Sequence, residues 1–225
     1  YRMEISTMNY FDWVRPATKA LWTFDDDDGT DSGPYGYDLT AGHLDYTLGR
    51  FGRCGYFDGN NYLIAANTCP QLALTTMSIC FWMKSTDTGE GYALGNVDVS
   101  DYTYGFNAGI VSSKVFFETF NGSGYVHRRT GGSISLSDNK WHWIVITRGA
   151  IYTNFYVDGK LDYSGSNTAL AYDGYEITCL GAWWGDYDNA AHDHFYGYID
   201  NMQILSIELD HATIRRMYAF QMGWI

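Results

Sequence analysis

The sequence predicts an all-β fold, a sandwich of two antiparallel sheets with one short helix near the C-terminus. Aromatic residues make up 18% of the 225 residues and glycines number 25, a mixture that suits strands joined by tight turns. Short apolar runs recur at intervals typical of a sandwich. No helical pattern of about 10–15 residues alternates with them, which argues against a parallel α/β sheet. A sandwich of this length needs no second domain.

The charge balance excludes some partners. There are 14 Lys and Arg residues against 26 Asp and Glu residues, for a formal net charge of -12. Such a chain repels polyphosphates, so we expect no nucleic-acid partner. No apolar stretch approaches the roughly 18 residues of a membrane span, so we expect no membrane insertion. The chain opens on Tyr1 without a charged and then apolar leader, and we therefore expect that any signal peptide has been removed or lies outside the sequence given.

The N-terminal segment 1–19 is predicted to be an arm, and 20–225 to be the domain. Pro16 interrupts the segment, and its apolar residues follow no sustained period. An arm of this kind packs on its own domain or on a neighbouring subunit, so we expect an oligomer.

Strand-like runs fill most of the chain after the arm. Turn sequences separate them, for example the four aspartates that precede Gly29 and the Asp-Gly pairs at 58–59 and 158–159. The predicted strands are 20–24, 54–57, 62–65, 77–84, 114–120, 141–148, 152–157, 161–163, 175–182 and 195–205.

One helix is predicted over 210–219. Asp210 can cap it, and Ile214, Met217 and Tyr218 fall on one face. Trp82 and Trp143 lie in two of the predicted strands, and we expect both rings in the core layer between the sheets.

The four cysteines, Cys54, Cys69, Cys80 and Cys179, show no metal-finger spacing. They permit two disulfides in three connectivities. Equally, Cys54, Cys80 and Cys179 sit in apolar runs where a free thiol behaves as a small hydrophobe. Asn121 begins an Asn-Gly-Ser glycosylation sequon, which matters if a eukaryote secretes the protein.

An ordered series of motifs resembles the laminin-G-like, concanavalin A-like jelly-roll superfamily over roughly residues 20–220. The resemblance implies a jelly-roll sandwich. The tail 218–224 is similar to the aromatic tail that follows the C-terminal helix in the phage-encoded branch of that family. The motifs are Leu-Trp-Thr-Phe-Asp at 21–25, Asp-Ser-Gly at 31–33, Gly-Arg-Phe-Gly at 49–52, Tyr-Phe-Asp-Gly at 56–59, 78–84, 141–147, Phe-Tyr-Val-Asp-Gly at 155–159 and 197–204.

Catalysis is not expected. Glycan-cleaving members of that superfamily place two glutamates and an aspartate on one strand, and glycoside cleavage needs a pair of carboxyl groups about 5–10 Å apart. The closest two glutamates here, Glu90 and Glu118, are 28 positions apart. A nucleophile elbow and the basic strand pattern of alginate lyases are missing from the sequence as well.

The resemblance implies one structural Ca²⁺, held where the first strand, an early glycine carbonyl and the last strand meet. Matched by motif, the ligands are Asp25, Gly59 and Asp200, with Asp31 as a fourth member. Oxygen ligands of this kind suit Ca²⁺. Pro34 and Tyr35 replace the residues that usually follow Ser-Gly in the family. The alternative is that the four aspartates 25–28 form a solvated acidic turn without an ion.

The segment 182–194 is rich in aromatic and acidic residues. Trp183, Trp184, Asp186 and Tyr187 are the predicted ligand-binding residues, because flat rings suit the apolar faces of sugars and carboxylates accept their hydroxyls. The same composition also suits a loop that packs on the sandwich edge or on a neighbouring subunit. The pair of histidines at 192 and 194 lacks a third metal ligand. The Tyr- and Asp-rich segment 98–104 could contribute to either surface.

Two functions remain. The first is a structural or adhesive surface component, such as a virion decoration or fibre subunit or an extracellular assembly subunit, with protein neighbours and some glycan contact. The second is a secreted carbohydrate-binding module that uses the 182–194 segment. Both place the protein outside the cell or on a virion surface.

Overall fold

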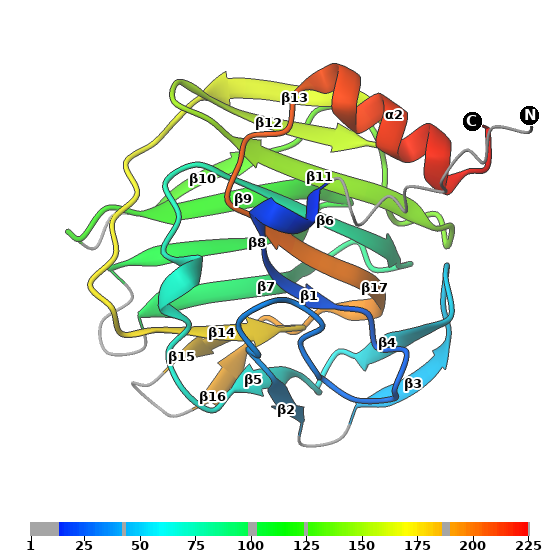
Figure 1. Ribbon diagram of the computed structural model, residues 1–225, viewed down its shortest axis with the longest axis horizontal. Helices are drawn as coiled ribbons and strands as arrows, with labels where there is room; N and C mark the ends of the chain where they lie inside the picture. Colours follow the sequence, from blue (N-terminus) through cyan, green and yellow to red (C-terminus); the bar gives the residue numbers. More distant parts are fainter. Residues whose placement is uncertain (1–13, 42–43, 99–102, 124–125, 186–189, 225) are drawn as a thin grey trace, which may run out of the picture.

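The computed structural model describes residues 14–41, 44–98, 103–123, 126–185 and 190–224. Two antiparallel sheets pack face to face, with a short C-terminal helix on one side (Figure 1). The predicted fold class is therefore confirmed.

Sheet A is the sheet that carries the C-terminal helix. Its strands lie in the order β13-β12-β11-β6-β17-β4-β3, and β1 pairs with β17 beside β4. Its members are β1 (Thr18–Trp22), β3 (Asp45–Leu48), β4 (Arg53–Asp58), β6 (Met77–Lys84), β11 (His142–Arg148), β12 (Tyr152–Val157), β13 (Lys160–Ser166) and β17 (Tyr196–Leu205).

Sheet B forms the other layer, in the order β10-β9-β8-β7-β14-β5-β2, and a separate hairpin joins β15 to β16. The elements outside sheet A are β2 (Leu39–Ala41), β5 (Leu63–Ala65), β7 (Glu90–Asp98), β8 (Gly105–Val111), β9 (Lys114–Phe120), β10 (Val126–Thr130), β14 (Glu176–Leu180), β15 (Trp183–Gly185), β16 (Ala190–His192), the 3₁₀ turns η1 (Arg15–Ala17) and η2 (Pro70–Leu72), and the helix α2 (His211–Gln221).

The main core fills the space between the two sheets. Strand residues alternate between the two faces of a sheet, so every second side chain enters this layer. In β11, for example, Ile144 and Ile146 belong to the inter-sheet core, whereas Trp143 and Val145 point to the outer face of sheet A.

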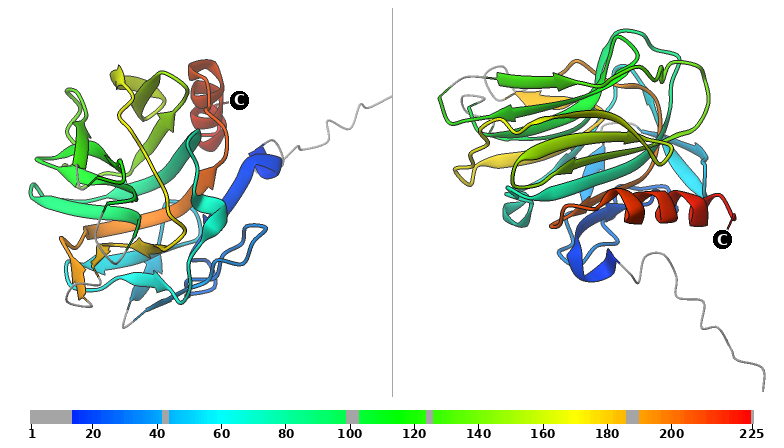
Figure 2. Two further views of the ribbon diagram at one scale, coloured as in Figure 1. Left: turned by 90° about the vertical axis from the view of Figure 1, so that its left-hand side faces the viewer. Right: turned by 90° about the horizontal axis from the view of Figure 1, so that it is seen from above.

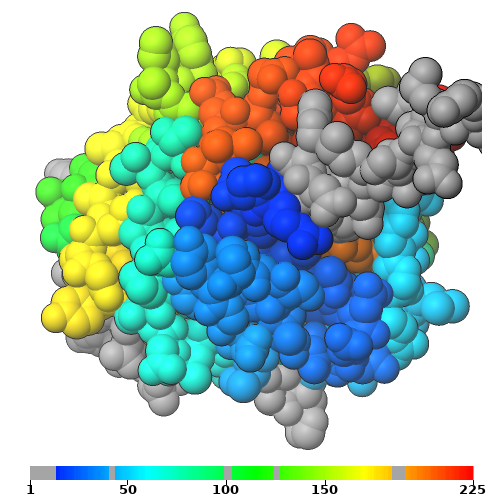
Figure 3. Space-filling model, in the orientation of Figure 1, coloured from blue at the N-terminus to red at the C-terminus, as the bar shows by residue number. Residues whose placement is uncertain are grey.

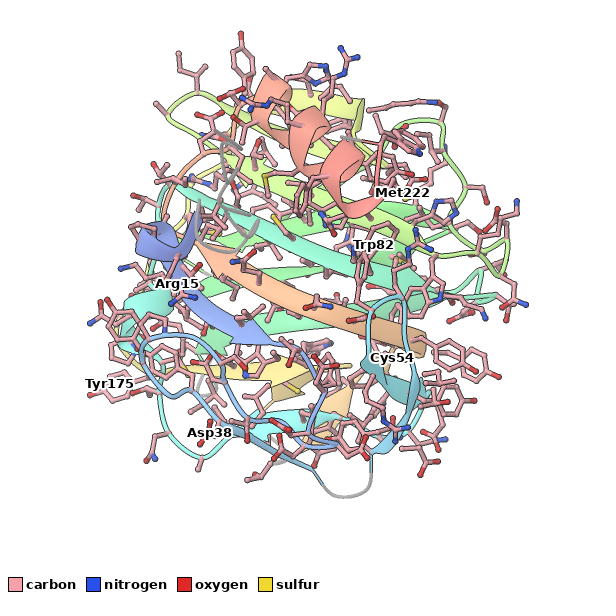
Figure 4. The ribbon with its side chains drawn as sticks, turned by 45° about the vertical axis from the view of Figure 1, so that its right-hand side comes forward. Arg15, Asp38, Cys54, Trp82, Tyr175 and Met222 are labelled. Carbon is pink, nitrogen blue, oxygen red and sulfur yellow. The ribbon has the colours of Figure 1, made fainter. Side chains whose placement is uncertain are left out.

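Trp82 and Trp143 are buried, but the expectation that they lie between the sheets is wrong. Each is 2% exposed, and both belong to a second apolar cluster on the outer face of sheet A. The Tyr218 ring of α2 stacks on both indoles, with centroid distances of 6.1 and 6.2 Å. In Figure 4, Trp82 lies on β6 near Met222, which follows α2. The helix thus covers a face that the strand pattern alone leaves open.

The predicted helix is confirmed, with its N-cap. The backbone N–H of Thr213 donates to Asp210 Oδ1 at 2.9 Å, and Ile214 and Met217 are buried on sheet A. Figure 2 shows α2 on one side of the sandwich and sheet B on the other.

Part of the predicted arm belongs to the fold. Residues 1–13 lie outside the described residues, but Val14 is 3% exposed and packs in the same cluster as Trp82. The backbone N–H of Ser206 donates to Ala17 O at 2.8 Å. The start of the described chain therefore lies against the segment that leads into α2, and the space-filling view shows this face (Figure 3).

All four cysteines are buried and none forms a disulfide. Burial raises the pKa of the Cys54 thiol to about 12, and burial also raises the pKa values of Cys69, Cys80 and Cys179. Of the two alternatives, the structure has the free thiols, which act as small apolar side chains.

Candidate functional site

The β15–β16 hairpin lies over the outer face of sheet B. It crosses β7 at Gly95, where a Cβ atom would lie 3.3 Å from Trp183 Cα and 2.9 Å from Asn107 Oδ1. A glycine in the strand lets the backbone of the hairpin approach this closely. The aromatic segment of the sequence is thereby held against a sheet face.

An aromatic pair forms the outer part of this site. The Trp183 and His192 rings stack with a centroid distance of 4.8 Å and an interplanar angle of 28°. Trp183 Nε1 donates to Asp193 Oδ2 at 3.0 Å, and the Trp183 ring also lies 6.3 Å from that of Tyr92 on β7. The indole is thus oriented by contacts with both its own hairpin and the sheet.

A cluster of charged side chains adjoins these rings on the same face, and Arg128 of β10 is its centre. Arg128 Nε donates to Glu118 Oε1 at 2.6 Å, and Nη1 donates to Glu90 Oε2 at 3.1 Å. Its Nη2 donates to the Tyr92 hydroxyl at 2.9 Å, and the guanidinium lies 4.7 Å from the centre of the Phe116 ring. One guanidinium therefore ties together side chains from β7, β9 and β10.

The cluster is buried at its base and open at its top. Glu118 is 3% exposed, whereas about a third of each of the Arg128 and Glu90 side chains is accessible. The hydrogen bond from Arg128 lowers the pKa of Glu90, and burial raises the pKa of Tyr92. Asn107 Nδ2 donates to Glu118 Oε2 at 3.3 Å. Glu90 and Arg128 are thus the members that a ligand can reach.

The structure places only part of the predicted ligand-binding set. Trp183 lies in the site, and Trp184 follows it in β15. Asp186 and Tyr187 lie outside the described residues. The two histidines of the segment diverge, because His192 stacks on Trp183 whereas His194 packs near Tyr62, with 6.0 Å between ring centroids.

The residues that sequence reasoning missed are Glu90, Tyr92, Asn107, Glu118 and Arg128. They come from four neighbouring strands, β7 to β10, of which β7, β8 and β10 were not predicted. The 28-residue separation of Glu90 and Glu118 does not keep them apart, since both carboxylates contact one guanidinium.

Two of the four predicted calcium ligands, Asp25 and Asp200, accept hydrogen bonds from the same loop, residues 51–53. Asp200 Oδ2 accepts the backbone N–H of Phe51 at 2.9 Å, and Asp25 Oδ1 accepts that of Arg53 at 2.8 Å. Asp200 is fully buried, and burial raises its pKa to about 7, with a further contribution from the charge of Asp25. The Asp25 side chain is exposed at the rim.

The other two predicted ligands have different neighbours. The Asp31 carboxylate accepts three backbone N–H groups, from Leu21, Gly33 and Tyr37, at 2.7–2.9 Å. Gly59 directly follows β4, whose last residue, Asp58, pairs with Tyr196 of β17. Calcium binding by these four residues stays a prediction. Among the residues that the structure describes, no three His, Cys, Asp or Glu side chains form a group that could hold a metal ion.

A separate cavity of about 340 Å³ lies between α2 and the outer face of sheet A. Trp82, Trp143, Phe51 and Phe220 supply apolar walls, and Asp25 lies at its edge. It is on the opposite side of the sandwich from the Arg128 cluster.

Comparison with solved structures finds the same fold in binding domains. Domain 4 of AbnA, an extracellular arabinanase from Geobacillus stearothermophilus, solved in complex with arabinotriose, superposes with a TM-score of 0.68 at 17% identity. The match covers 90% of this chain and 98% of that domain.

Two toxin domains are similar as well. The binding domain of Paraclostridial Mosquitocidal Protein 1 gives a TM-score of 0.75 at 13% identity, and a structure from a study of botulinum neurotoxin type C gives 0.73 at 14%. Each match covers 92% of this chain but only 53% and 52% of the toxin chains, so the chain spans about half their length. Comparison with curated protein sequences gives no match.

The family model for concanavalin A-like lectins and glucanases, Laminin_G_3, matches residues 57–215. This range includes the Arg128 cluster and the β15–β16 hairpin. The chain is a member of the concanavalin A-like lectin/glucanases superfamily.

Proposed function

We propose that this protein is a non-catalytic carbohydrate-binding domain and that its ligand lies on the outer face of sheet B. The observation that carries the proposal is the stacked Trp183–His192 pair beside the Arg128 cluster. Glycan sites combine a flat ring for the C–H face of a sugar with nearby polar groups that fix its hydroxyls. Glu90 and Arg128 are accessible polar groups within this arrangement.

The ion pairs of the cluster favour binding over cleavage. A glycosidase needs one carboxyl group that stays protonated near neutral pH, which requires a raised pKa. Here Arg128 holds the pKa of Glu90 below its usual range, and its guanidinium is also bonded to Glu118. Two ion-paired carboxylates are suited to accept sugar hydroxyls and unsuited to general acid catalysis.

The similar folds support the proposal by analogy. The AbnA domain was solved with a bound arabinotriose, and the type C neurotoxin study reports cell entry that depends on two ganglioside molecules. The arabinanase is an extracellular enzyme, and we propose an extracellular location for this chain as well. None of the helices in the described ranges is long and apolar enough to cross a membrane.

A glycan array followed by calorimetry of the strongest oligosaccharide tests the proposal. We expect binding by the unmodified protein and a loss of at least tenfold in affinity for Trp183→Ala, since one aromatic contact contributes about 1–3 kcal/mol when fully used. Trp224→Ala is the matched control, because Trp224 is 66% exposed on the tail after α2, away from sheet B. Absence of binding on the array, or an equal loss in both variants, would refute the proposal.

A second candidate function is assembly with other subunits, for example on a virion or in an extracellular layer. It is favoured by the outermost hairpin of sheet A, where β13 is an edge strand and Ile151, Tyr152 and Leu161 are 50–65% exposed. Unpaired edges with apolar side chains pair readily with other chains. Light scattering of the full chain and of Leu161→Lys tests it, and a monomer at all concentrations would reject it.

A truncation that tests the N-terminal arm must leave in place the residues that pack on the domain. Because Val14 is buried and Ala17 is bonded to Ser206, a truncated protein should begin at Val14. If the arm drives assembly, we expect this truncation to yield monomers with an unchanged melting temperature.

We propose that, of the four residues predicted to bind calcium, only Asp25 and Asp200 can share one ion. The support is that both carboxylates bond to the loop of residues 51–53. Calorimetric titration of chelated protein with Ca²⁺ tests this. We expect heat on binding and a higher melting temperature, both lost in Asp25→Asn; no heat and no shift would dismiss the ion.

A further inference from the structure

Among the side chains that the structure describes, the cluster on the open face of sheet B has more hydrogen-bond acceptors than uncommitted donors. The cluster holds two carboxylates and one guanidinium, so its formal charge is -1. Asp193 lies next to Trp183 on the hairpin, and the whole chain carries a net charge of -12. A ligand that approaches Trp183 therefore meets a negative potential.

Arg128 is the cation of this cluster, and its Nε, Nη1 and Nη2 atoms already donate hydrogen bonds within the cluster. It donates through Nε to Glu118 and through both Nη atoms to Glu90, in the bidentate geometry that arginine also uses for ligand carboxylates or sulfates. The Tyr92 hydroxyl accepts from Nη2 as well. Its lower face is covered, because the guanidinium lies over the Phe116 ring. To bind an anionic ligand, Arg128 would have to give up an existing ion pair.

Asn107 is separate evidence that the site holds more hydrogen-bond acceptors than donors. It is 2% exposed, its Nδ2 donates to Glu118, and its Oδ1 is buried without a hydrogen-bond partner in the described part of the chain. This oxygen points toward the space at Gly95 beneath Trp183. A buried acceptor with no donor costs free energy, which a donor brought to the site would offset.

We propose that the site selects neutral, hydroxyl-rich glycans and rejects those that carry carboxylate or sulfate groups. This inference rests on the proposed carbohydrate-binding function and names its ligand class. Sugar hydroxyls donate to the outward lone pairs of Glu90 and its neighbours without disturbing Arg128. A uronic acid or a sulfated sugar adds a negative charge to a cluster that already has one in excess.

Paired oligosaccharides that differ in charge test the inference. The array should carry matched neutral and acidic probes, such as galacto-oligosaccharides with oligogalacturonates and lactose with sialyllactose, at 20 and 500 mM NaCl. At 20 mM we expect at least tenfold weaker binding of the acidic member of each pair. At 500 mM the difference should narrow, because salt screens repulsion between exposed charges.

Glu90→Gln is the decisive variant, since it removes the excess charge and frees part of Arg128. We expect the neutral-to-acidic affinity ratio to fall by at least threefold. Glu208→Gln is the matched control, because Glu208 is an exposed carboxylate between β17 and α2 that gives the same change in net charge away from the site. It should leave the ratio unchanged.

The outcomes separate the inference from the function on which it rests. Equal or tighter binding of the acidic probes by the unmodified protein, lost in Trp183→Ala, would overturn the charge selection and leave carbohydrate binding standing. An equal change of ratio in Glu90→Gln and Glu208→Gln would also overturn it. If no probe of either class binds, both proposals fail together.

Discussion

The Arg128 cluster makes a strong prediction about stability, because it contains a carboxylate that is buried at its base. Replacing Arg128 with Met keeps an apolar stem over Phe116 but leaves Glu118, which is 3% exposed, without its cation. Removing one partner of a buried ion pair costs about 3–5 kcal/mol. Since 32% of the Arg128 side chain is exposed and solvent screens part of the charge, we expect a smaller loss, about 2–3 kcal/mol at pH 8.

Urea unfolding followed by tryptophan fluorescence measures this loss of stability at pH 8. Adding Glu118→Gln to Arg128→Met should recover most of the loss, because the double variant buries no charge. Arg215→Met is the control, since Arg215 is exposed on α2, and it should change stability by less than about 0.5 kcal/mol. A loss below about 1 kcal/mol at pH 8, or no recovery of stability in the double variant, would refute the account of the cluster.

Three further predictions concern the scaffold. His142 bonds to Asp158 and Asp138 at 2.8 and 3.0 Å, and its pKa is raised, mainly by Asp158. The two hydrogen bonds should therefore stabilise the fold fully below about pH 6.5, and their contribution should decrease as the pH rises through the raised pKa. In urea unfolding, His142→Gln should lower the free energy of unfolding more at pH 6 than at pH 8.5. An equal loss at both pH values would contradict this. Asp31→Asn replaces one of the two carboxylate oxygens that accept three backbone N–H groups, and it should lower the free energy of unfolding by about 1–3 kcal/mol in thermal unfolding, equally with Ca²⁺ and with a chelator; a loss seen only with Ca²⁺ would argue for a metal role. Asp210→Ala removes the cap of α2 and should cost about 1 kcal/mol by chemical denaturation, and an unchanged midpoint would show that tertiary packing alone fixes the helix start.

Most of sheet A could be predicted from the sequence, because its strands have apolar runs with clear ends. The bounds predicted for β6 and β12 are those of the structure, and so are the bounds predicted for β9 in sheet B. By contrast, β7 and β8 were missed, since each contains glycines where strand propensity is low. At Gly109 a Cβ atom would lie 2.2 Å from Gly91 O, so tertiary contact requires glycine at a position where local propensity disfavours a strand.

It was easier to predict that a side chain is buried than to predict on which face of the sheet it is buried. Large apolar rings such as Trp82 and Trp143 are expected to be buried, but a period of two does not say which sheet face will be covered. Which face is covered depends on where α2 packs. The Tyr218 contacts that fix its position join segments about 75 to 136 positions apart in the sequence.

The candidate site, too, could be predicted from the sequence only in part. Local composition identified the aromatic segment that contains Trp183, because rings and carboxylates are close in sequence. The Arg128 cluster arises from the register of β7, β8, β9 and β10, in which Glu118 pairs with both Asn107 and Arg128. No spacing along the chain reports that juxtaposition, so only the paired strands reveal it.

The most direct test of the central claim is to observe the indole of Trp183 during binding. In a ¹H–¹⁵N NMR titration with the best oligosaccharide from the array, the Nε1–H signal that disappears in Trp183→Ala should shift with saturation. The signals of Trp82 and Trp143, buried beneath α2 on the other side of the sandwich, should stay in place. A glycan that binds and shifts only the latter signals would place the site under α2 and contradict the account.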